Sequence, residues 1–179
     1  EVAVPFLRGR PIVMVRYPDG IAGKSFYQWH VPKGTPDWIR SLEVREEGER
    51  GKSRKRTFLI DDIDGLLFIA NLGCIPIHVL AAHEGSRELC DFLTIDFDLG
   101  GQPFRDAVTL AMTLREMLTE LGLKGFPKTS GQSGLHVLIP MGDAVPFTTA
   151  KALVQLLGRL LEVKHHDIAT TERVKNKRG

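Results

Sequence analysis

Two long amphipathic patterns flank a hairpin signal in the second half of the chain. Apolar residues recur at helical spacing over residues 104–121 and again over 147–163, so both stretches are predicted to be helices. The segment between them, KGFPKTSGQSGLHVLIP, is typical of two strands joined by a glycine-bearing turn. Strands and helices interleaved in this way favour an α+β or α/β fold with a mixed sheet over a doubly wound parallel sheet.

The first half of the chain is predicted to consist mainly of short strands. Over the whole chain, strands outside the hairpin are expected at residues 11–17, 25–31, 38–46, 57–60, 75–80 and 92–99. One helix is expected to be capped by Asp61 or Asp62, to carry its apolar stripe on Ile63, Leu66, Leu67 and Ala70, and to end near Gly73. The charged stretch 46–56 and residues 83–91 are expected to be loops.

Composition suits a soluble globular protein, because 42% of the 179 residues are hydrophobic and 26% are charged. The formal net charge of +2 is too small to identify a nucleic-acid binder. Basic residues nevertheless cluster at two places, where a solvated loop and a solvated tail are the simpler interpretations: Lys52, Arg54, Lys55 and Arg56, and then Lys175, Lys177 and Arg178.

The cysteines and the hydropathy of the chain indicate the cellular compartment in which the protein is expected. Cys74 and Cys90 form no CxxC pair and no zinc-ligand spacing, which fits a reducing environment. The chain has no signal peptide and no apolar run of membrane length. A cytoplasmic protein with no membrane partner is therefore expected.

The stretch LTIDFDLG, residues 93–100, sets two acids within a predicted strand. Side chains alternate between the faces of a strand, so Asp96 and Asp98 share one face while Ile95, Phe97 and Leu99 point to the other. Two neighbouring carboxylates repel each other unless a cation lies between them, and Mg²⁺ or Mn²⁺ prefers such oxygen ligands. The motif therefore fits a two-metal site, although a solvated edge strand or a sugar-nucleotide transferase would also carry it.

The hairpin turn carries a second group of candidate residues. Ser130, Gly131, Ser133 and Gly134 form a turn whose backbone N–H groups could converge on an anion. His136 follows on the next predicted strand and could donate a hydrogen bond to a phosphate held by that turn. The alternative is a hairpin of small residues with a structural histidine.

Three further residues are candidates for a site. His78 lies in IPIHVL, on the face opposite Ile77 and Val79, where a lone histidine is usually structural. Phe26 and Tyr27 are adjacent in a predicted strand and therefore face opposite ways. One of these aromatic rings is expected in the core, while the other could be exposed and stack on a base.

Four segments, taken in order, resemble the polymerase/primase domain of bacterial ATP-dependent DNA ligase D. They are RPIVMVRYPDGIAGKSFYQWH, DDIDGLLFIANLGCIPIHV, TIDFDLG and FPKTSGQSGLHVLIP. That domain belongs to the archaeo-eukaryotic primase superfamily and serves non-homologous end joining. The resemblance covers nearly the whole chain. It implies an α+β primase-polymerase fold, with a mixed or antiparallel sheet related to the RNA-recognition motif and flanked by helices.

The resemblance also implies roles for individual residues. Asp96 and Asp98 match the first two metal-binding, catalytic acids of the family, which uses Mn²⁺ or Mg²⁺. Ser130, His136 and His78 match residues that hold the incoming nucleoside triphosphate. A site for two divalent ions and a triphosphate is therefore expected.

The implied activity is template-dependent addition of (ribo)nucleotides to a DNA 3′-hydroxyl at a double-strand break. Phe26 and Tyr27 match an aromatic pair that stacks on the template. The implied partners are DNA ends with a template strand, a Ku-type end-binding protein and a covalently linked ligase domain. A catalytically inactive nucleic-acid-binding module of the same fold is the alternative.

The chain departs from the family pattern at several points. Ser133 stands where the family commonly has a lysine, so one triphosphate contact is expected to be weaker or supplied elsewhere. The third metal acid is expected just after Gly179, and lysines that bind a 5′-phosphate are expected before residue 1. Residues 1–179 are thus expected to be a single domain truncated at both ends and impaired in catalysis. Ligation is not expected, because the chain has no K-x-D-G motif.

Overall fold

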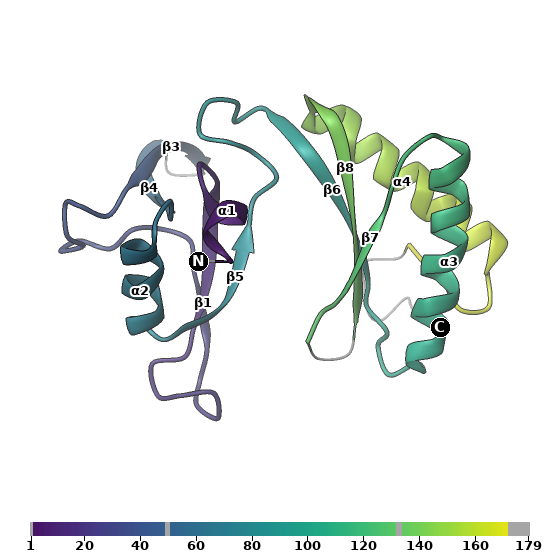
Figure 1. The fold of residues 1–179 in the computed structure, drawn as a ribbon, viewed down its shortest axis with the longest axis horizontal. Coiled ribbons are helices and arrows are strands. Elements are labelled where there is room, and N and C mark those ends of the chain that lie inside the picture. The colour runs from purple at the N-terminus through teal and green to yellow at the C-terminus, as the bar shows by residue number, and fades with distance from the viewer. Residues whose placement is uncertain (1, 49–50, 132–133, 172–179) are drawn as a thin grey trace. The chain divides into compact units, whose positions relative to one another are not determined.

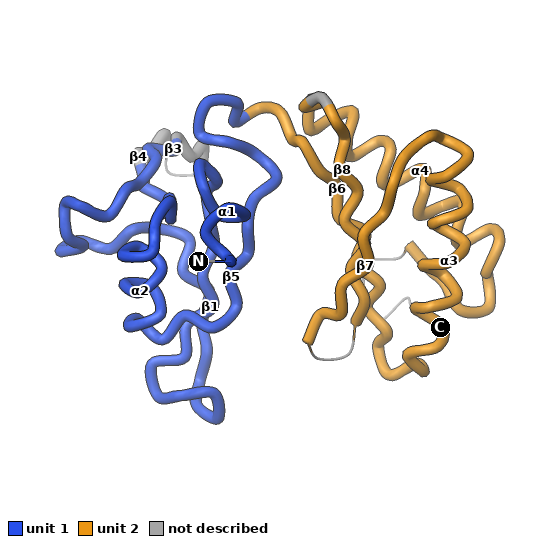
Figure 2. Tube along the Cα trace, viewed as in Figure 1, with its two compact units in different colours: residues 1–87 blue, residues 88–179 orange. Residues whose placement is uncertain are grey.

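A computed structural model describes residues 2–48, 51–131 and 134–171 (Figure 1). The chain divides into two compact units, residues 1–87 and 88–179, which are coloured separately in Figure 2. Every pairing between the described strands is antiparallel. Helices and antiparallel sheets together confirm the predicted α+β class.

The first unit contains a five-stranded sheet around β1 (Pro11–Arg16). One edge of β1 pairs with β4 (Gly51–Leu59) and then with β2 (Phe26–Gln28), while the other edge pairs with β5 (Cys74–Val79). Strand β3 (Ser41–Gly48) pairs along β4. Strand β1 has partners on both edges and its residues 11–15 are buried, so it forms the centre of this unit.

Helix α2 (Ile63–Asn71) begins and ends where the sequence predicts. The Asp62 carboxylate caps it by accepting a hydrogen bond from Gly65 N at 2.8 Å, and Gly73 follows with a φ of +74°. The predicted apolar stripe is wrong in part: Leu66 packs against the core, but Ile63 and Leu67 are 45% and 60% exposed. The buried face instead contains Gly65 and Ile69. Apolar residues surround almost the whole helix, so their spacing alone does not select the buried face.

The predicted loop over residues 46–56 is also wrong. Strands β3 and β4 continue through it as a hairpin, with Gly48 opposite Gly51. The register places Glu43 opposite Arg56, and cross-strand pairs of opposite charge stabilise a sheet. Charged residues in alternation are therefore compatible with a hairpin here, although their polarity resembles that of a loop.

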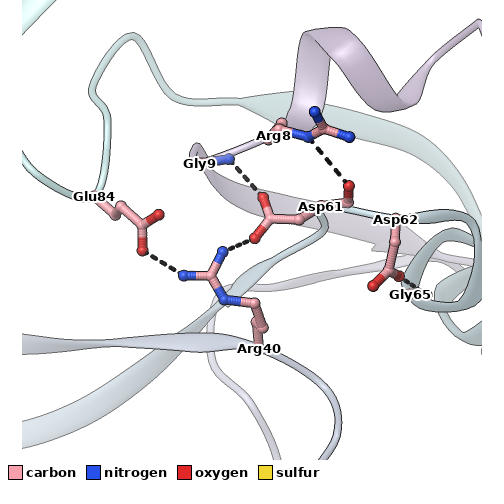
Figure 3. Close-up of polar contacts among 7 residues, drawn as sticks. All are labelled: Arg8, Gly9, Arg40, Asp61, Asp62, Gly65 and Glu84. Carbon is pink, nitrogen blue, oxygen red and sulfur yellow. Dashed lines mark hydrogen bonds and ion pairs between the residues drawn. The ribbon is translucent and has the colours of Figure 1, made fainter.

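Asp61 joins four segments of the first unit (Figure 3). One carboxylate oxygen accepts a hydrogen bond from Gly9 N at 2.6 Å, just after α1 (Val4–Leu7), and the other pairs with the Arg40 guanidinium. Arg40 also contacts Glu84 at 2.8 Å, and the Asp61 carbonyl accepts a hydrogen bond from Arg8 Nε at 3.4 Å. The Asp61 side chain is only 13% exposed, so this network has a structural role.

The second unit consists of a three-stranded sheet and two helices. Its strands are β6 (Leu89–Phe97), β8 (Leu135–Pro146) and β7 (Phe126–Thr129), with β8 in the middle. The predicted loop at 83–91 is therefore shorter than expected, because β6 already begins at Leu89. Helices α3 (Phe104–Glu120) and α4 (Phe147–Lys164) confirm both amphipathic predictions and cover one face of the sheet (Figure 1).

The core of the second unit lies between that face and the helices. Strand residues Leu93, Ile95, Val137 and Ile139 alternate with exposed neighbours and are at most 8% exposed. The helices contribute buried residues at helical spacing: Leu110, Leu114, Leu118, Leu157 and Leu161. Among the described residues of this unit, no helix covers the opposite face of the sheet (Figure 1).

Neither cysteine offers an activated thiol. Burial raises the pKa of Cys74 and, together with the Asp91 carboxylate, the pKa of Cys90. Both groups therefore remain protonated thiols near neutral pH, which disfavours nucleophilic or metal-binding chemistry. Among the described residues, no helix is long and apolar enough to cross a membrane.

Candidate functional site

Three polar side chains form a row across the open face of the three-stranded sheet. The strand register places Asp96 of β6 opposite His136 of β8, and His136 opposite Lys128 of β7. Directly opposed residues of antiparallel strands point to the same face. Their neighbours Ile95 and Val137 point into the core, so this row belongs to the exposed face.

Asp96 and His136 are in direct contact. The distance from His136 Nε2 to Asp96 Oδ1 is 3.4 Å, and the two side chains are 35% and 62% exposed. A polar contact so exposed to water adds little to stability. Both groups therefore remain accessible to a ligand that would insert between them or bind beside them.

Asp98 follows the last residue of β6 instead of lying within the strand. Its Oδ1 accepts a hydrogen bond from Gly100 N at 3.3 Å, and Gly100 and Gly101 have φ values of +56° and +103°. A turn therefore positions this carboxylate, whereas the β6–β8 ladder positions Asp96. The strand pattern placed both acids on one face of a strand, but only Asp96 lies within β6.

The donor set suits a hard divalent cation, because Asp96 and Asp98 are exposed carboxylates two residues apart. His136 is close enough to Asp96 to compete with such an ion for the carboxylate. Within residues 2–48, 51–131 and 134–171, no group of three or more histidine, cysteine or acidic side chains is arranged to hold a metal.

Ser130 closes the hairpin turn through two reciprocal hydrogen bonds. Its Oγ accepts from Gly134 N at 2.8 Å, and its own N–H donates to the Gly134 carbonyl at 2.9 Å. The Gly134 N–H is therefore engaged within the turn. It is not directed at an anion, although the sequence pattern indicated it as a candidate anion donor. A Cβ on Gly134 would approach Phe97 O to 3.1 Å, which places the turn against the end of β6. The Ser133 position lies outside the described residues.

The first unit holds the remaining candidates on both sides of β1. Tyr27 pairs with Val15, and His78 pairs with Val13 from the other edge of β1, so both side chains lie on one face. Their ring centroids are 5.6 Å apart. Tyr27 is 61% exposed, so this face presents an aromatic pair to its surroundings.

Phe26 lies on the opposite face of the same short strand. It is 45% exposed, so the prediction that Phe26 or Tyr27 belongs to the core is wrong. Strand β2 has only three residues and leaves both rings uncovered. Arg16, which sequence reasoning missed, lies over the Phe26 ring at 5.3 Å and donates to Gln28 Oε1 at 2.7 Å and Leu72 O at 2.8 Å.

The structure thus brings the predicted residues together in two groups. Asp96, His136 and the Ser130 turn, with Asp98 beyond the strand end, belong to the second unit. Phe26, Tyr27 and His78 belong to the first unit. Sequence reasoning also missed Lys128, whose place beside His136 follows only from the β7–β8 register.

Comparison with known proteins identifies the family. A family model described as the LigD primase-polymerase domain matches residues 1–179. The chain belongs to the LigD primase-polymerase family. This confirms the resemblance inferred from the four ordered motifs.

Similar proteins include LigD proteins of non-homologous end joining. The DNA repair protein LigD of Mycobacterium tuberculosis H37Rv is 29% identical over 189 residues, which cover 100% of this chain and 24% of the relative. The bifunctional LigD of Bacillus subtilis is 29% identical over 183 residues, which cover 99% of this chain and 28% of the relative. The chain therefore spans about a quarter of the length of these relatives.

A solved structure agrees with the fold. The polymerase domain of Mycobacterium tuberculosis ligase D, determined in complex with DNA, is similar to this chain with a TM-score of 0.87 and 27% sequence identity. The similarity covers 99% of this chain and 64% of that one. The fold is therefore that of a LigD polymerase domain.

Proposed function

We propose that this chain is part of a template-dependent nucleotidyltransferase that adds (ribo)nucleotides to a DNA 3′-hydroxyl at double-strand breaks. The observation that carries the proposal is the contact between Asp96 and His136 on the open face of the sheet, beside the Ser130 turn. A carboxylate that would bind metal and donors that would contact phosphate thus lie next to one another in a chain of the LigD primase-polymerase family.

Asp96 and Asp98 would hold Mn²⁺ or Mg²⁺. Both carboxylates are exposed, and their oxygens are the ligands that these ions prefer. When bound, divalent ions would neutralise the triphosphate and lower the pKa of the attacking 3′-hydroxyl.

The protein's own contribution is to position the triphosphate. His136 would donate a hydrogen bond from Nε2 to a phosphate oxygen, because this nitrogen already points along the row toward Asp96. Ser130 would donate a hydrogen bond from its hydroxyl to the same group, since the turn fixes its Oγ through the hydrogen bond from Gly134 N. Such pre-positioned donors stabilise charge that develops during phosphoryl transfer.

The first unit would supply the contacts to the template and a further contact to phosphate. Phe26 and Tyr27 are exposed and on opposite faces of β2, so either ring is available to stack on a base. His78 would act as a third phosphate ligand. Its position beside Tyr27 would place a phosphate contact next to a stacking surface.

We further propose DNA ends with a template strand as the principal partner. The similar ligase D domain was determined in complex with DNA, and the relatives are named as non-homologous end joining proteins. A Ku-type end-binding protein and a linked ligase domain would be further partners, with the protein acting at the bacterial nucleoid.

Manganese and nucleotide binding by this chain test the proposal. Asp96→Asn is expected to weaken Mn²⁺ binding about tenfold, since one carboxylate ligand loses its charge. The matched control is Glu116→Gln, which neutralises an exposed acid on α3 and should leave Mn²⁺ binding unchanged. Equal Mn²⁺ affinity of Asp96→Asn and the wild type, measured by electron paramagnetic resonance, would contradict the proposed metal site.

The alternative is a nucleic-acid-binding module without catalysis. It is favoured by one observation: among the described residues, no group of three or more histidine, cysteine or acidic side chains is arranged to hold a metal. DNA binding without any Mn²⁺-dependent affinity for ATP would support this alternative. Affinity for ATP that requires both Mn²⁺ and Asp96 would support the nucleotidyltransferase.

A further inference from the structure

Lys128 ends the polar row on the open face of the second unit. It lies on edge strand β7, directly opposite His136, which in turn lies opposite Asp96. Its ammonium donates to the carbonyl of its neighbour Thr129 at 3.4 Å, near the limit for a hydrogen bond. In the described part of the chain, Lys128 takes part in no ion pair.

The position of Lys128 relative to the turn is also defined. Ser130 follows two residues later, just beyond the last residue of β7, so Lys128 lies within the strand that leads into the turn. Beyond the last ladder pair, Thr129–Leu135, the Ser130 N–H donates to the Gly134 carbonyl and the Ser130 Oγ accepts from Gly134 N, so the turn is held next to the end of β7. Lys128 is therefore opposite His136 in register and two residues before Ser130, at the end of the sheet where the turn lies.

The charges of the neighbouring side chains favour a permanently charged cation as a phosphate ligand here. Asp96 and Asp98 are both acidic, Ser130 is neutral, and a histidine carries charge only when protonated. A triphosphate approaching these groups meets two carboxylates and needs positive charge on the side away from the metal ligands. A lysine ammonium supplies a full charge and three donors to phosphate oxygens.

We propose that Lys128 is a phosphate-binding residue of this site, holding the nucleoside triphosphate from the β7 side while His136 and Ser130 hold it from β8 and the turn. This inference rests on the proposed function. It adds a residue that the local sequence pattern did not single out. A lysine that is only exposed to solvent on the edge strand would contribute nothing to nucleotide affinity.

The test is a series of variants that change the charge at position 128. The affinity of the chain of 179 residues for ligands is measured for each. ATP, inorganic tripolyphosphate and adenosine are titrated in the presence of Mn²⁺ by calorimetry. Lys128→Met is expected to weaken ATP and tripolyphosphate about tenfold, the usual cost of losing a charge-assisted hydrogen bond. Lys128→Arg should stay within about threefold of the wild type, and Lys128→Glu should weaken binding further than methionine. Adenosine binding should be the same for every variant.

Lys151→Met is the matched control, because Lys151 is an exposed lysine of the same unit on the helix side, in α4. It should bind ATP as the wild type does. If the wild type binds ATP but affinity does not follow the charge at position 128, the inference fails while the proposed function stands. If the wild type binds ATP no more tightly than adenosine with Mn²⁺ present, the proposed function fails and this inference fails with it.

Discussion

His136 Nε2 lies 3.4 Å from Asp96 Oδ1, across the β6–β8 ladder. The two residues are opposite one another in register, so the backbone of two strands determines their contact. A candidate metal ligand and a candidate phosphate donor are thereby held side by side on a rigid element. Such a support positions functional groups more precisely than a loop would.

Replacing His136 separates its role in binding from its role in stability. His136→Gln should change the free energy of unfolding by less than about 1 kcal/mol, because the pair with Asp96 is exposed. It should weaken ATP binding in Mn²⁺ about tenfold through loss of a phosphate donor. Urea unfolding and calorimetry measure the two effects. His166→Gln, at an exposed position of the same unit, serves as the control. Unchanged ATP affinity in His136→Gln would remove the histidine from the site.

Gly134 is required by close packing at the turn. A Cβ there would meet Phe97 O at 3.1 Å and Ser130 Oγ at 3.3 Å, so Gly134→Ala should destabilise the second unit by about 1–3 kcal/mol. It should also weaken ATP binding, because Ser130 would be displaced. Gly85→Ala is the matched control, since a Cβ at Gly85 meets no atom within 4 Å. Equal unfolding free energies for the two variants in urea would show that the turn tolerates the methyl group.

The Asp61 network predicts a loss of stability without loss of binding chemistry. Asp61→Ala leaves Gly9 N without its acceptor and Arg40 without one of its two acidic partners, which should cost about 2 kcal/mol. Asp37→Ala, an exposed acid of the same unit, should stay within about 0.5 kcal/mol of the wild type. Thermal and urea unfolding give the comparison. An Asp61→Ala protein as stable as Asp37→Ala would mean that the network does not hold these segments together.

The exposed rings of Phe26 and Tyr27 are predicted to contribute to the affinity for a template strand. Phe26→Ala and Tyr27→Ala should each weaken binding of single-stranded DNA by about 1–3 kcal/mol if the ring stacks on a base. Phe6→Ala, which removes a 71% exposed ring on α1, is the control and should leave the affinity unchanged. Fluorescence anisotropy with labelled oligonucleotides measures the affinities. An equal loss of DNA affinity in all three variants would indicate nonspecific binding by exposed rings and would contradict a specific stacking role.

The elements with strong periodicity were predictable from the sequence. The helices over residues 104–121 and 147–163 and the hairpin between them are confirmed, since amphipathic spacing and a glycine-bearing turn are local signals. The hairpin over residues 46–56 was missed because its charged residues resemble a loop, and only pairing between β3 and β4 makes them a sheet.

The site was predictable only in part, for a related reason. The alternation in LTIDFDLG correctly places Asp96 on the open face, but the end of β6 before Asp98 depends on where pairing with β8 stops. Lys128 was missed because its neighbour His136 lies eight residues away in sequence and becomes adjacent only through the strand register. Likewise, the exposure of both Phe26 and Tyr27 depends on how little of β2 is covered.

Templated nucleotide addition tests the central claim most directly. The complete natural polypeptide that carries this chain is incubated with a recessed DNA end, Mn²⁺ and ribonucleoside triphosphates, and extension of the 3′-hydroxyl is followed on a gel. The wild type should add nucleotides complementary to the template. The double variant Asp96→Asn, Asp98→Asn should lose at least about a hundredfold in rate, while still binding the DNA. Extension by the double variant at the wild-type rate, or no templated addition by the wild type, would contradict the account.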